Sequence, residues 1–292
     1  MLANQATYKT PASCGELLQG VIQDSLVLIS CPVNIYNTVT VRLNDSGVIK
    51  CIPDLNKSRQ AVINTLKFFG YHDIGAEITV SNPMPKSKGL GSSTSDVTSS
   101  IAATAKAIGE YITPDQIAAL AVNIEPSDAT MFHEMVLFAH RSGNIINTLG
   151  ELPSIDILAV DFGGIIDTVE YNTVDRFAQW KKFEKETENA LNHIKLGITN
   201  KNVSLIGKGA TINTITSNKI DPNPNLEAML TLGESLDARG VSMAHSGTII
   251  SLLFDPQQKT MTYALKQAKQ KLEVYETITH FRSTQPGPIE IK

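Results

Sequence analysis

The sequence lacks any apolar run long enough to cross a membrane. Its most apolar segment, IDILAVDFGGII at residues 155–166, is short and is interrupted by Asp161, whereas a membrane-spanning helix needs about 20 apolar residues. The first ten residues, MLANQATYKT, show no basic stretch followed by an apolar one, which is the pattern of a secretory signal. The sequence therefore predicts a cytoplasmic protein.

Cysteine and excess charge are also scarce. The three cysteines, Cys14, Cys31 and Cys51, are odd in number and have no metal-ligand spacing, which argues against a disulfide framework and a zinc site. Lysine and arginine number 25 against 29 acidic residues, a net charge of −4. This balance gives no reason to expect nucleic acid or an anionic membrane as a partner.

An ordinary globular composition is what remains. The chain has 292 residues, of which 42% are hydrophobic, enough for one large or two medium domains. Strand patterns and helix patterns are mixed without regular βα alternation, so we expect an α+β fold. The order of elements changes near residue 150, which predicts two lobes, 1–150 and 151–292.

Several elements can be placed from periodicity and end signals. We expect a strand at 76–80 and another at 25–30. Helices are predicted over 56–70, from about residue 92 to 108, from Thr113, and over 128–143, DATMFHEMVLFAHRSG. In the second half, the pattern predicts strands near 155–162, 247–255 and 275–281, and helices over 174–194, 223–240 and 260–272.

The segment PMPKSKGLGSSTSDVTSS, at 83–100, lies between the strand at 76–80 and the helix from residue 92. Glycines let the backbone approach a ligand closely, and the free N–H groups of a helix start favour an anion. The hydroxyls and Lys86 and Lys88 could add further donors and cations. A glycine- and serine-rich surface connector would show the same local pattern, so this segment alone does not decide between the two. It is not a Walker A loop, because no Gly-Lys-Ser/Thr closes it.

Two further glycine motifs are weak when taken singly. PASCGELLQG, at 11–20, and SMAHSGTIISLLFD, at 242–255, would each more often be a simple turn. Cys14 lies in the first of them, but no partner base can be assigned, so a buried bystander is the better interpretation.

An acidic pair lies in NIEPSDATM, at 123–131. Glu125 and Asp128 are predicted to lie at a helix start, where carboxylates usually serve as caps. Next to a phosphate loop, one of them could instead hold magnesium and the other position or deprotonate a hydroxyl nucleophile.

The order of these motifs resembles the GHMP kinase family, which includes galactose, homoserine, mevalonate and phosphomevalonate kinases. PKSKGLGSST, from Pro85, is close to the family's phosphate loop. The resemblance implies a lobe like ribosomal protein S5 domain 2 followed by a ferredoxin-like lobe, with the site between them. Within the family, PASCGELLQG and SCPVN look most like the L-threonine kinases of cobalamin synthesis, which make O-phospho-L-threonine for the aminopropanol linker.

The resemblance also implies roles for residues. Glu125 is expected to be a magnesium ligand, together with Ser92 and Ser93, and Asp128 is expected to orient or deprotonate the acceptor hydroxyl. The residues expected to bind ATP are Pro85, Lys86, Ser87, Lys88, Gly89, Leu90, Gly91, Ser92, Ser93, Thr94 and Ser95. Those expected near the substrate are Ser13, Gly15, Glu16, Asn34, Ser246 and Gly247.

Three hypotheses about the function remain at this point. The first is ATP- and Mg²⁺-dependent phosphorylation of L-threonine, and the second is another small-alcohol kinase of the family, above all homoserine kinase. The third is a non-catalytic GHMP-like protein that senses a metabolite. The expected partners are small molecules, ATP and L-threonine, and a homodimer is compatible with the sequence.

Overall fold

The computed structural model describes residues 4–292 except for 52–54, 85–87, 165–173, 245–246 and 258–260. Among these residues it has the strands β1 (Gln5–Ile22), β2 (Ser25–Asn44), β3 (Ile49–Lys50), β4 (Gly75–Ser81), β5 (Met135–Ala139), β6 (Asn144–Gly150), β7 (Asp156–Asp161), β8 (Gly240–Met243), β9 (Ile249–Phe254), β10 (Thr277–Arg282) and β11 (Ile289–Ile291). The helices are α1 (Asn56–Phe68), α2 (Ser92–Ala107), α3 (Pro114–Val122), α5 (Phe177–Lys181), α6 (Glu184–Thr199), α7 (Val203–Asn218), α8 (Leu226–Ser235) and α9 (Met261–Lys271).

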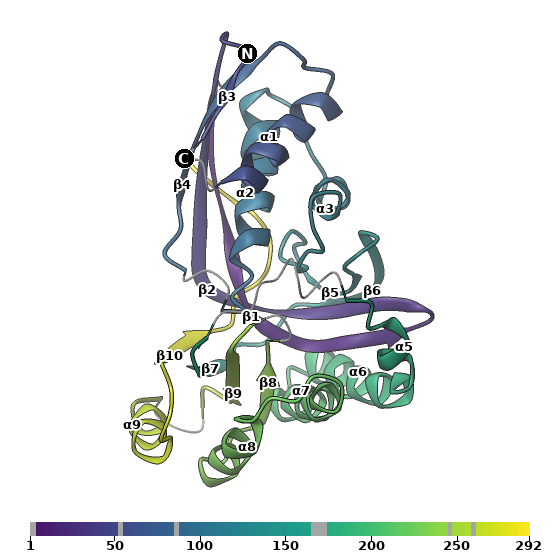
Figure 1. Ribbon diagram of the computed structural model, residues 1–292, viewed down its shortest axis with the longest axis vertical. Helices are drawn as coiled ribbons and strands as arrows, with labels where there is room; N and C mark the ends of the chain where they lie inside the picture. Colours follow the sequence, from purple (N-terminus) through teal and green to yellow (C-terminus); the bar gives the residue numbers. More distant parts are fainter. Residues whose placement is uncertain (1–3, 52–54, 85–87, 165–173, 245–246, 258–260) are drawn as a thin grey trace.

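The long hairpin of β1 and β2 joins two groups of elements (Figure 1). One group has β3 and β4 beside the hairpin and carries α1, α2 and α3. The other has β7 to β10 and carries α6 to α9. The strands are connected in the order β10-β7-β9-β8-β1-β2-β4-β3, and β11 returns to pair with β1. The expected α+β class is confirmed, and the residue at which the two lobes divide stays a prediction.

Each group has its own buried core. Val97 and Ile101 of α2 are fully buried against α3 and β5, and the other face of the α1–α2 layer packs on β2 and β4. Leu158 and Leu252 belong to a second core between β7 to β9 and the helices α8 and α9. The strip of small residues in α2, nearly all buried, lets this helix approach the strands closely.

Most predicted elements are confirmed, and Thr113 caps α3 in a capping box with Gln116. The helix predicted over 128–143 is wrong. Residues Met135–Ala139 form β5, all five of them buried, which pairs with β2 and β6. A short apolar run fits a buried strand as well as a helix, and here the sheet partners decide.

One other prediction needs correction, and one helix was not predicted. The helix predicted over 174–194 is two helices, α5 and α6, interrupted at Lys182 and Phe183. The helix that was not predicted is α7, which is rich in Gly, Ser and Thr and therefore has low helix propensity. A methyl group on Gly207 would lie 2.8 Å from the Gly240 nitrogen, so this glycine lets α7 pack directly on β8.

Candidate active site

The loop after β4 enters α2 through left-handed glycines. Gly89 has a φ of +87° and Gly91 a φ of +60°, a conformation that other residues adopt only with strain. Gly91 is the N-cap of α2 and has no side chain to cap it, whereas the Thr113 side chain accepts a hydrogen bond in α3. The first N–H groups of α2 are thus without a side-chain cap, an arrangement that suits an anion.

The first glycine motif, residues 11–20, holds this loop through main-chain hydrogen bonds. The Ser13 N–H donates to the Leu90 carbonyl at 3.1 Å, and the Gly15 N–H donates to the Gly89 carbonyl at 3.0 Å. The pairing of β1 with β2 is irregular here, with register shifts on both sides of Ser13, and Gly15 has a φ of +67°. The bulged part of β1 is therefore free to pair with the loop.

The third glycine motif, residues 242–255, contacts the same loop. The Thr248 N–H donates to the Lys88 carbonyl at 3.2 Å. A methyl group on Gly89 would overlap the Ala244 side chain and lie 3.1 Å from the Gly247 Cα. The structure thus brings together the three glycine motifs predicted from the sequence. Ser246 lies outside the described residues, as do Pro85, Lys86 and Ser87.

Glu125 lies at the start of α2, on the loop after α3. The Ser93 hydroxyl donates a short hydrogen bond to Glu125 Oε1, and Lys57 Nζ lies 2.5 Å from Glu125 Oε2. Glu125 and Asp128 were predicted at a helix start, which is wrong, because residues 125–128 form an irregular loop. Pro126 has no N–H to donate, and the Ser127 N–H pairs with the His140 carbonyl next to β5.

Asp128 lies against the phosphate-loop glycine. Its Oδ1 accepts a long hydrogen bond, 3.4 Å, from the Ser30 hydroxyl, and its N–H donates to Thr94 Oγ1 at 3.2 Å. A methyl group on Gly91 would lie 2.5 Å from Asp128 Oδ2 and 3.2 Å from the Ser13 Cβ. The carboxylate therefore borders both the loop and the first glycine motif.

The pKa of Asp128 is raised to about 8. Burial among protein atoms is the main cause, and the negative charge of Glu16 adds to it. The Ser30 hydrogen bond acts in the opposite direction, and Glu125 raises the pKa further. A carboxyl group that titrates near neutral pH is suited to accept a proton during a reaction.

Lys88 is engaged by carboxylates of the second group of elements. Its Nζ lies 2.6 Å from Glu276 Oε2 and 2.9 Å from Asp161 Oδ2, and it donates to the Gly164 carbonyl. The hydrogen bond to Glu276, followed by that to Asp161, raises the pKa of Lys88. The Thr248 hydroxyl donates to Asp161 Oδ1 at 2.6 Å, so this cluster also fixes the third glycine motif.

Comparison with known proteins identifies the family. Residues 56–133 match the family described as GHMP kinases N terminal domain. The chain is 30% identical to the L-threonine kinase of Salmonella typhimurium over 293 residues. This alignment covers 99% of this chain and 96% of the relative. The chain belongs to the GHMP kinase family.

Two further comparisons agree with this. The L-threonine kinase of Citrobacter freundii is 29% identical to this GHMP kinase over 297 residues, 98% of this chain and the full length of the relative. The crystal structure of homoserine kinase from Cytophaga hutchinsonii superposes with a TM-score of 0.73 at 18% identity, covering 99% of this chain and 98% of that one. At that identity the superposition shows a shared fold, and the predicted GHMP kinase fold is confirmed.

The oxygen atoms at the start of α2 in this GHMP kinase fit a magnesium ion. Ser93 and Glu125 supply a hydroxyl and a carboxylate in direct contact, and hard oxygen donors are what Mg²⁺ prefers. The described residues contain no cluster of three or more His, Cys, Asp or Glu side chains that could hold a metal. Mg²⁺ usually keeps several waters and substrate phosphates as ligands, so two protein ligands are enough for it.

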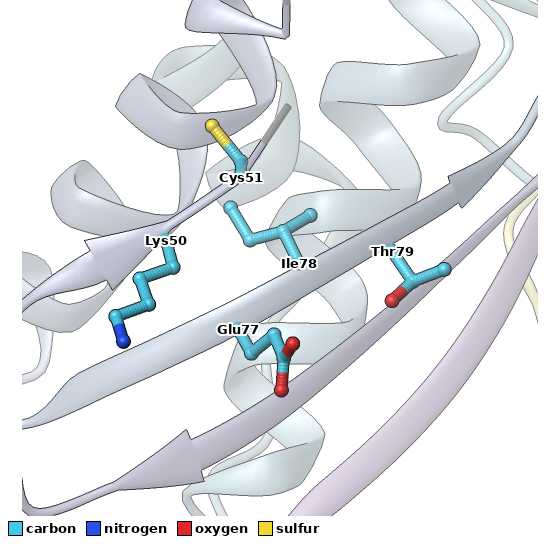
Figure 2. Close-up of a pocket in the computed structure, with 5 residues that line it drawn as sticks. All are labelled: Lys50, Cys51, Glu77, Ile78 and Thr79. Atoms are coloured by element: carbon cyan, nitrogen blue, oxygen red, sulfur yellow. The ribbon is translucent and has the colours of Figure 1, made fainter. Parts of the chain in front are cut away.

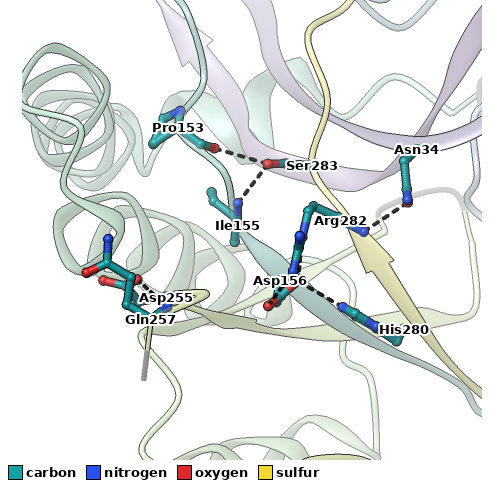
Figure 3. Close-up of polar contacts among 9 residues, drawn as sticks. All are labelled: Asn34, Pro153, Ile155, Asp156, Asp255, Gln257, His280, Arg282 and Ser283. Atoms are coloured by element: carbon teal, nitrogen blue, oxygen red, sulfur yellow. Dashed lines mark hydrogen bonds and ion pairs between the residues drawn. The ribbon is translucent and has the colours of Figure 1, made fainter. Parts of the chain in front are cut away.

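Asn34, predicted near the substrate, contacts the end of β10 (Figure 3). The Arg282 N–H donates to Asn34 Oδ1 at 2.9 Å. The Arg282 side chain donates hydrogen bonds from two nitrogens to the Asp156 carboxylate. His280 Nε2 lies 2.9 Å from the same carboxylate. Burial would raise the pKa of Asp156, but the hydrogen bonds from Arg282 and His280 outweigh it and lower this pKa. Asn34 therefore links β2 to a charged cluster of the second group.

Sequence reasoning missed several neighbours of the site. Lys57 carries no local motif and reaches the site only through the fold. Ser30 and Thr248 lie inside the motifs SCPVN and SMAHSGTIISLLFD but were not predicted as site residues. Cys14 is buried beside Ser251, and burial raises its pKa to about 12. Cys14 therefore stays a thiol at neutral pH, and its interpretation as a buried bystander stays a prediction.

A hollow of about 310 Å³ lies elsewhere, over β3 and β4 (Figure 2). Its lining residues are Lys50, Cys51, Glu77, Ile78 and Thr79. None of the residues predicted for the site is among them.

In the part of the chain that the structure describes, no helix is long and apolar enough to span a membrane.

Proposed function

We propose that this GHMP kinase transfers the γ-phosphoryl group of ATP to the side-chain hydroxyl of L-threonine. The observation that carries the proposal is the similarity to two L-threonine kinases along nearly the whole chain. The convergence of the three glycine motifs and the acidic pair on one helix start supports the same conclusion. The product would be O-phospho-L-threonine, which the family resemblance links to the aminopropanol part of cobalamin. A free amino acid and ATP as substrates suit a cytoplasmic enzyme.

The ATP phosphates would lie at the N-terminus of α2. Gly89 packs against the third glycine motif, and Gly91 packs against Ser13 and Asp128. The first N–H groups of α2 point a positive partial charge toward the phosphates. Ser93 and Glu125, with Ser92 beside them, would hold Mg²⁺. When bound, the metal neutralises charge on the phosphates.

The acceptor would lie between the first glycine motif and Asp128. Ser13 and Gly15 bind the phosphate loop through their N–H groups, and Glu16 follows them in β1, paired with Met243 of β8. Glu16 contributes negative charge here, as its effect on the pKa of Asp128 shows, and negative charge suits the ammonium group of an amino acid. Gly247 borders the phosphate loop at Gly89. Asn34 accepts a hydrogen bond from the Arg282 N–H at the end of β10, and its place near the substrate stays a prediction.

The chemical step follows from this placement. The hydroxyl oxygen attacks the γ-phosphorus in line, the bond from phosphorus to the β,γ-bridging oxygen breaks, and ADP leaves with that electron pair. The hydroxyl proton moves to Asp128, whose pKa of about 8 lets it accept and release a proton near neutral pH. Positioning and charge neutralisation supply most of the catalysis in such transfers.

ADP release with a panel of acceptors tests the proposal. The purified protein with Mg²⁺ and ATP should release ADP fastest with L-threonine, compared with L-serine, L-homoserine, mevalonate and galactose. A preference for L-homoserine would make it a homoserine kinase. ATP binding without turnover of any acceptor would instead support a metabolite sensor.

A further inference from the structure

One cation at the start of α2 has no part in the function proposed above. Lys57 lies in the first turn of α1, and its Nζ is 2.5 Å from Glu125 Oε2 and 3.3 Å from Ser93 Oγ. These are the same two side chains whose oxygens fit Mg²⁺. The Lys57 ammonium therefore occupies the donor set that the metal would use.

The two charged side chains differ in how far they are exposed to solvent. The Glu125 side chain is 13% exposed, whereas that of Lys57 is 38% exposed. A nearly buried carboxylate needs a cation or several hydrogen-bond donors to stay charged. Lys57, in contrast, has a flexible stem and solvent around it, so it can leave without creating a buried charge of its own.

Two cations cannot share one carboxylate closely without repelling each other. If Mg²⁺ takes Glu125 and Ser93, the Lys57 ammonium has to move away from them. The polyphosphate that the proposed function puts at the start of α2 could receive it, since lysine is a common phosphate ligand.

We propose that Lys57 is a nucleotide-site residue with two positions. In the free protein it holds Glu125 charged and close to Ser93, and when metal and nucleotide enter it passes to a phosphate oxygen of ATP. This inference rests on the ATP site of the proposed function. It adds a phosphate ligand from α1, outside the three glycine motifs.

Lys57→Met should change metal binding and nucleotide binding in opposite directions. Without the competing ammonium, Mn²⁺ alone should bind the nucleotide-free protein several-fold more tightly, as followed by the Mn²⁺ EPR signal. The Mg²⁺ complex of a non-hydrolysable ATP analogue should bind about tenfold more weakly by calorimetry, because one charged phosphate contact is lost. In turnover, KM for ATP should rise about tenfold, with kcat within about threefold.

The matched control is Lys106→Met. Lys106 forms a similar exposed ion pair, 3.1 Å, with Glu290 at the other end of α2, and its loss should leave all three measurements unchanged. Lys57→Arg should recover much of the analogue binding, and Glu125→Gln should abolish the binding of Mn²⁺.

Two results would overturn the inference. One is a Lys57→Met variant that binds both Mn²⁺ and the analogue as the parent does, and the other is a parallel weakening of both. A parent protein that binds the analogue normally but phosphorylates no acceptor would refute the proposed function and leave the role of Lys57 standing. A parent that binds no analogue would refute both.

Discussion

The phosphate loop has a lysine near each end, and the two are used differently. Lys88 is 9% exposed and lies between Asp161 and Glu276, beside the Thr248 hydroxyl that also contacts Asp161. Lys57, reaching in from α1, is far more exposed and touches the two groups that fit a metal. The first lysine joins the loop to the second group of elements, and the second faces the position where a ligand would enter.

The two ends of this short loop therefore differ: contacts within the protein hold one end, and the other end presents groups that can bind a ligand. Its Lys88 end is fixed by the buried ion pair of Lys88 with Asp161 and by main-chain hydrogen bonds from Gly15 and Thr248. Its Ser93 end keeps the first N–H groups of α2 and the Glu125 carboxylate for a ligand. A lysine in a glycine-rich loop therefore need not be a phosphate ligand, and one from a distant helix can be.

The largest expected effect comes from Asp128, which lies between the two ends of the loop. Asp128→Asn keeps the shape of the side chain but removes the proton acceptor, so kcat should fall by roughly 10²- to 10⁴-fold. Affinity for the ATP analogue should change little. Steady-state kinetics and calorimetry check the two halves of this prediction, and near-normal turnover would make Asp128 a purely structural residue.

The next effect tests the fixed end through Gly89. Gly89→Ala would force a φ of +87° on alanine and push its methyl group into Ala244, so we expect a loss of about 2–3 kcal/mol in the free energy of unfolding and strongly weakened ATP binding. Gly70→Ala is the matched control, because Gly70 has a φ of +81° with no atom within 4 Å of an added methyl group. It should cost about 1 kcal/mol and leave ATP binding intact. Equal behaviour of the two variants in urea unfolding and calorimetry would contradict the close packing of the loop.

Removal of the fixed lysine should follow in size. Lys88→Met leaves the buried Asp161 beside Glu276 without a cation, and we expect a loss of about 2 kcal/mol, less than for a fully buried pair because Glu276 is half exposed. Lys181 also bridges two carboxylates, Asp24 and Glu184, but at the surface. Lys181→Met should therefore leave the urea midpoint nearly unchanged. If Lys88→Met is as harmless as Lys181→Met, the cluster does not fix the loop.

A separate expected effect is a pH dependence of stability. Because the pKa of Asp128 is raised in the folded protein to about 8, the folded state holds a proton that the unfolded state releases above about pH 4. Its contribution to stability is therefore present at low pH and is lost as the pH rises toward 8. The Tm of Asp128→Asn relative to the parent should increase between pH 5 and pH 8, and a constant difference would rule out the raised pKa.

The same titration should appear in the kinetics. If Asp128 must be ionised to accept the proton, kcat/KM of the parent should rise with pH up to about 8, since this ratio reports the free enzyme. The profile of Asp128→Asn should lack this limb.

The sequence was informative where the backbone itself makes the site. Gly15, Gly89 and Gly247 stand in recognisable motifs because close main-chain contacts require glycine, and the structure brings these motifs together. The helices α1, α2 and α3 were predictable from their end signals and periodicity. The resemblance to one family then gave the fold that connects the motifs.

The remainder depended on contacts between distant segments. Nothing near Lys57 or Thr248 indicates which carboxylate it meets, since the partners lie 68 and 87 positions away in the chain. The strand β5 could not be told from a helix without its neighbours β2 and β6. The helix α7 could not be predicted from the sequence, because its glycines lower its helix propensity. Gly207 is needed there for close packing of α7 against β8.

The most direct test of the central claim is to identify the product. The protein should be mixed with Mg²⁺, ATP and L-threonine, and the phosphorus-containing products resolved by ³¹P NMR. We predict one new phosphomonoester signal, that of O-phospho-L-threonine, which grows in equal amount with ADP. ADP accompanied only by inorganic phosphate, or no reaction with L-threonine while another acceptor is phosphorylated, would contradict the account.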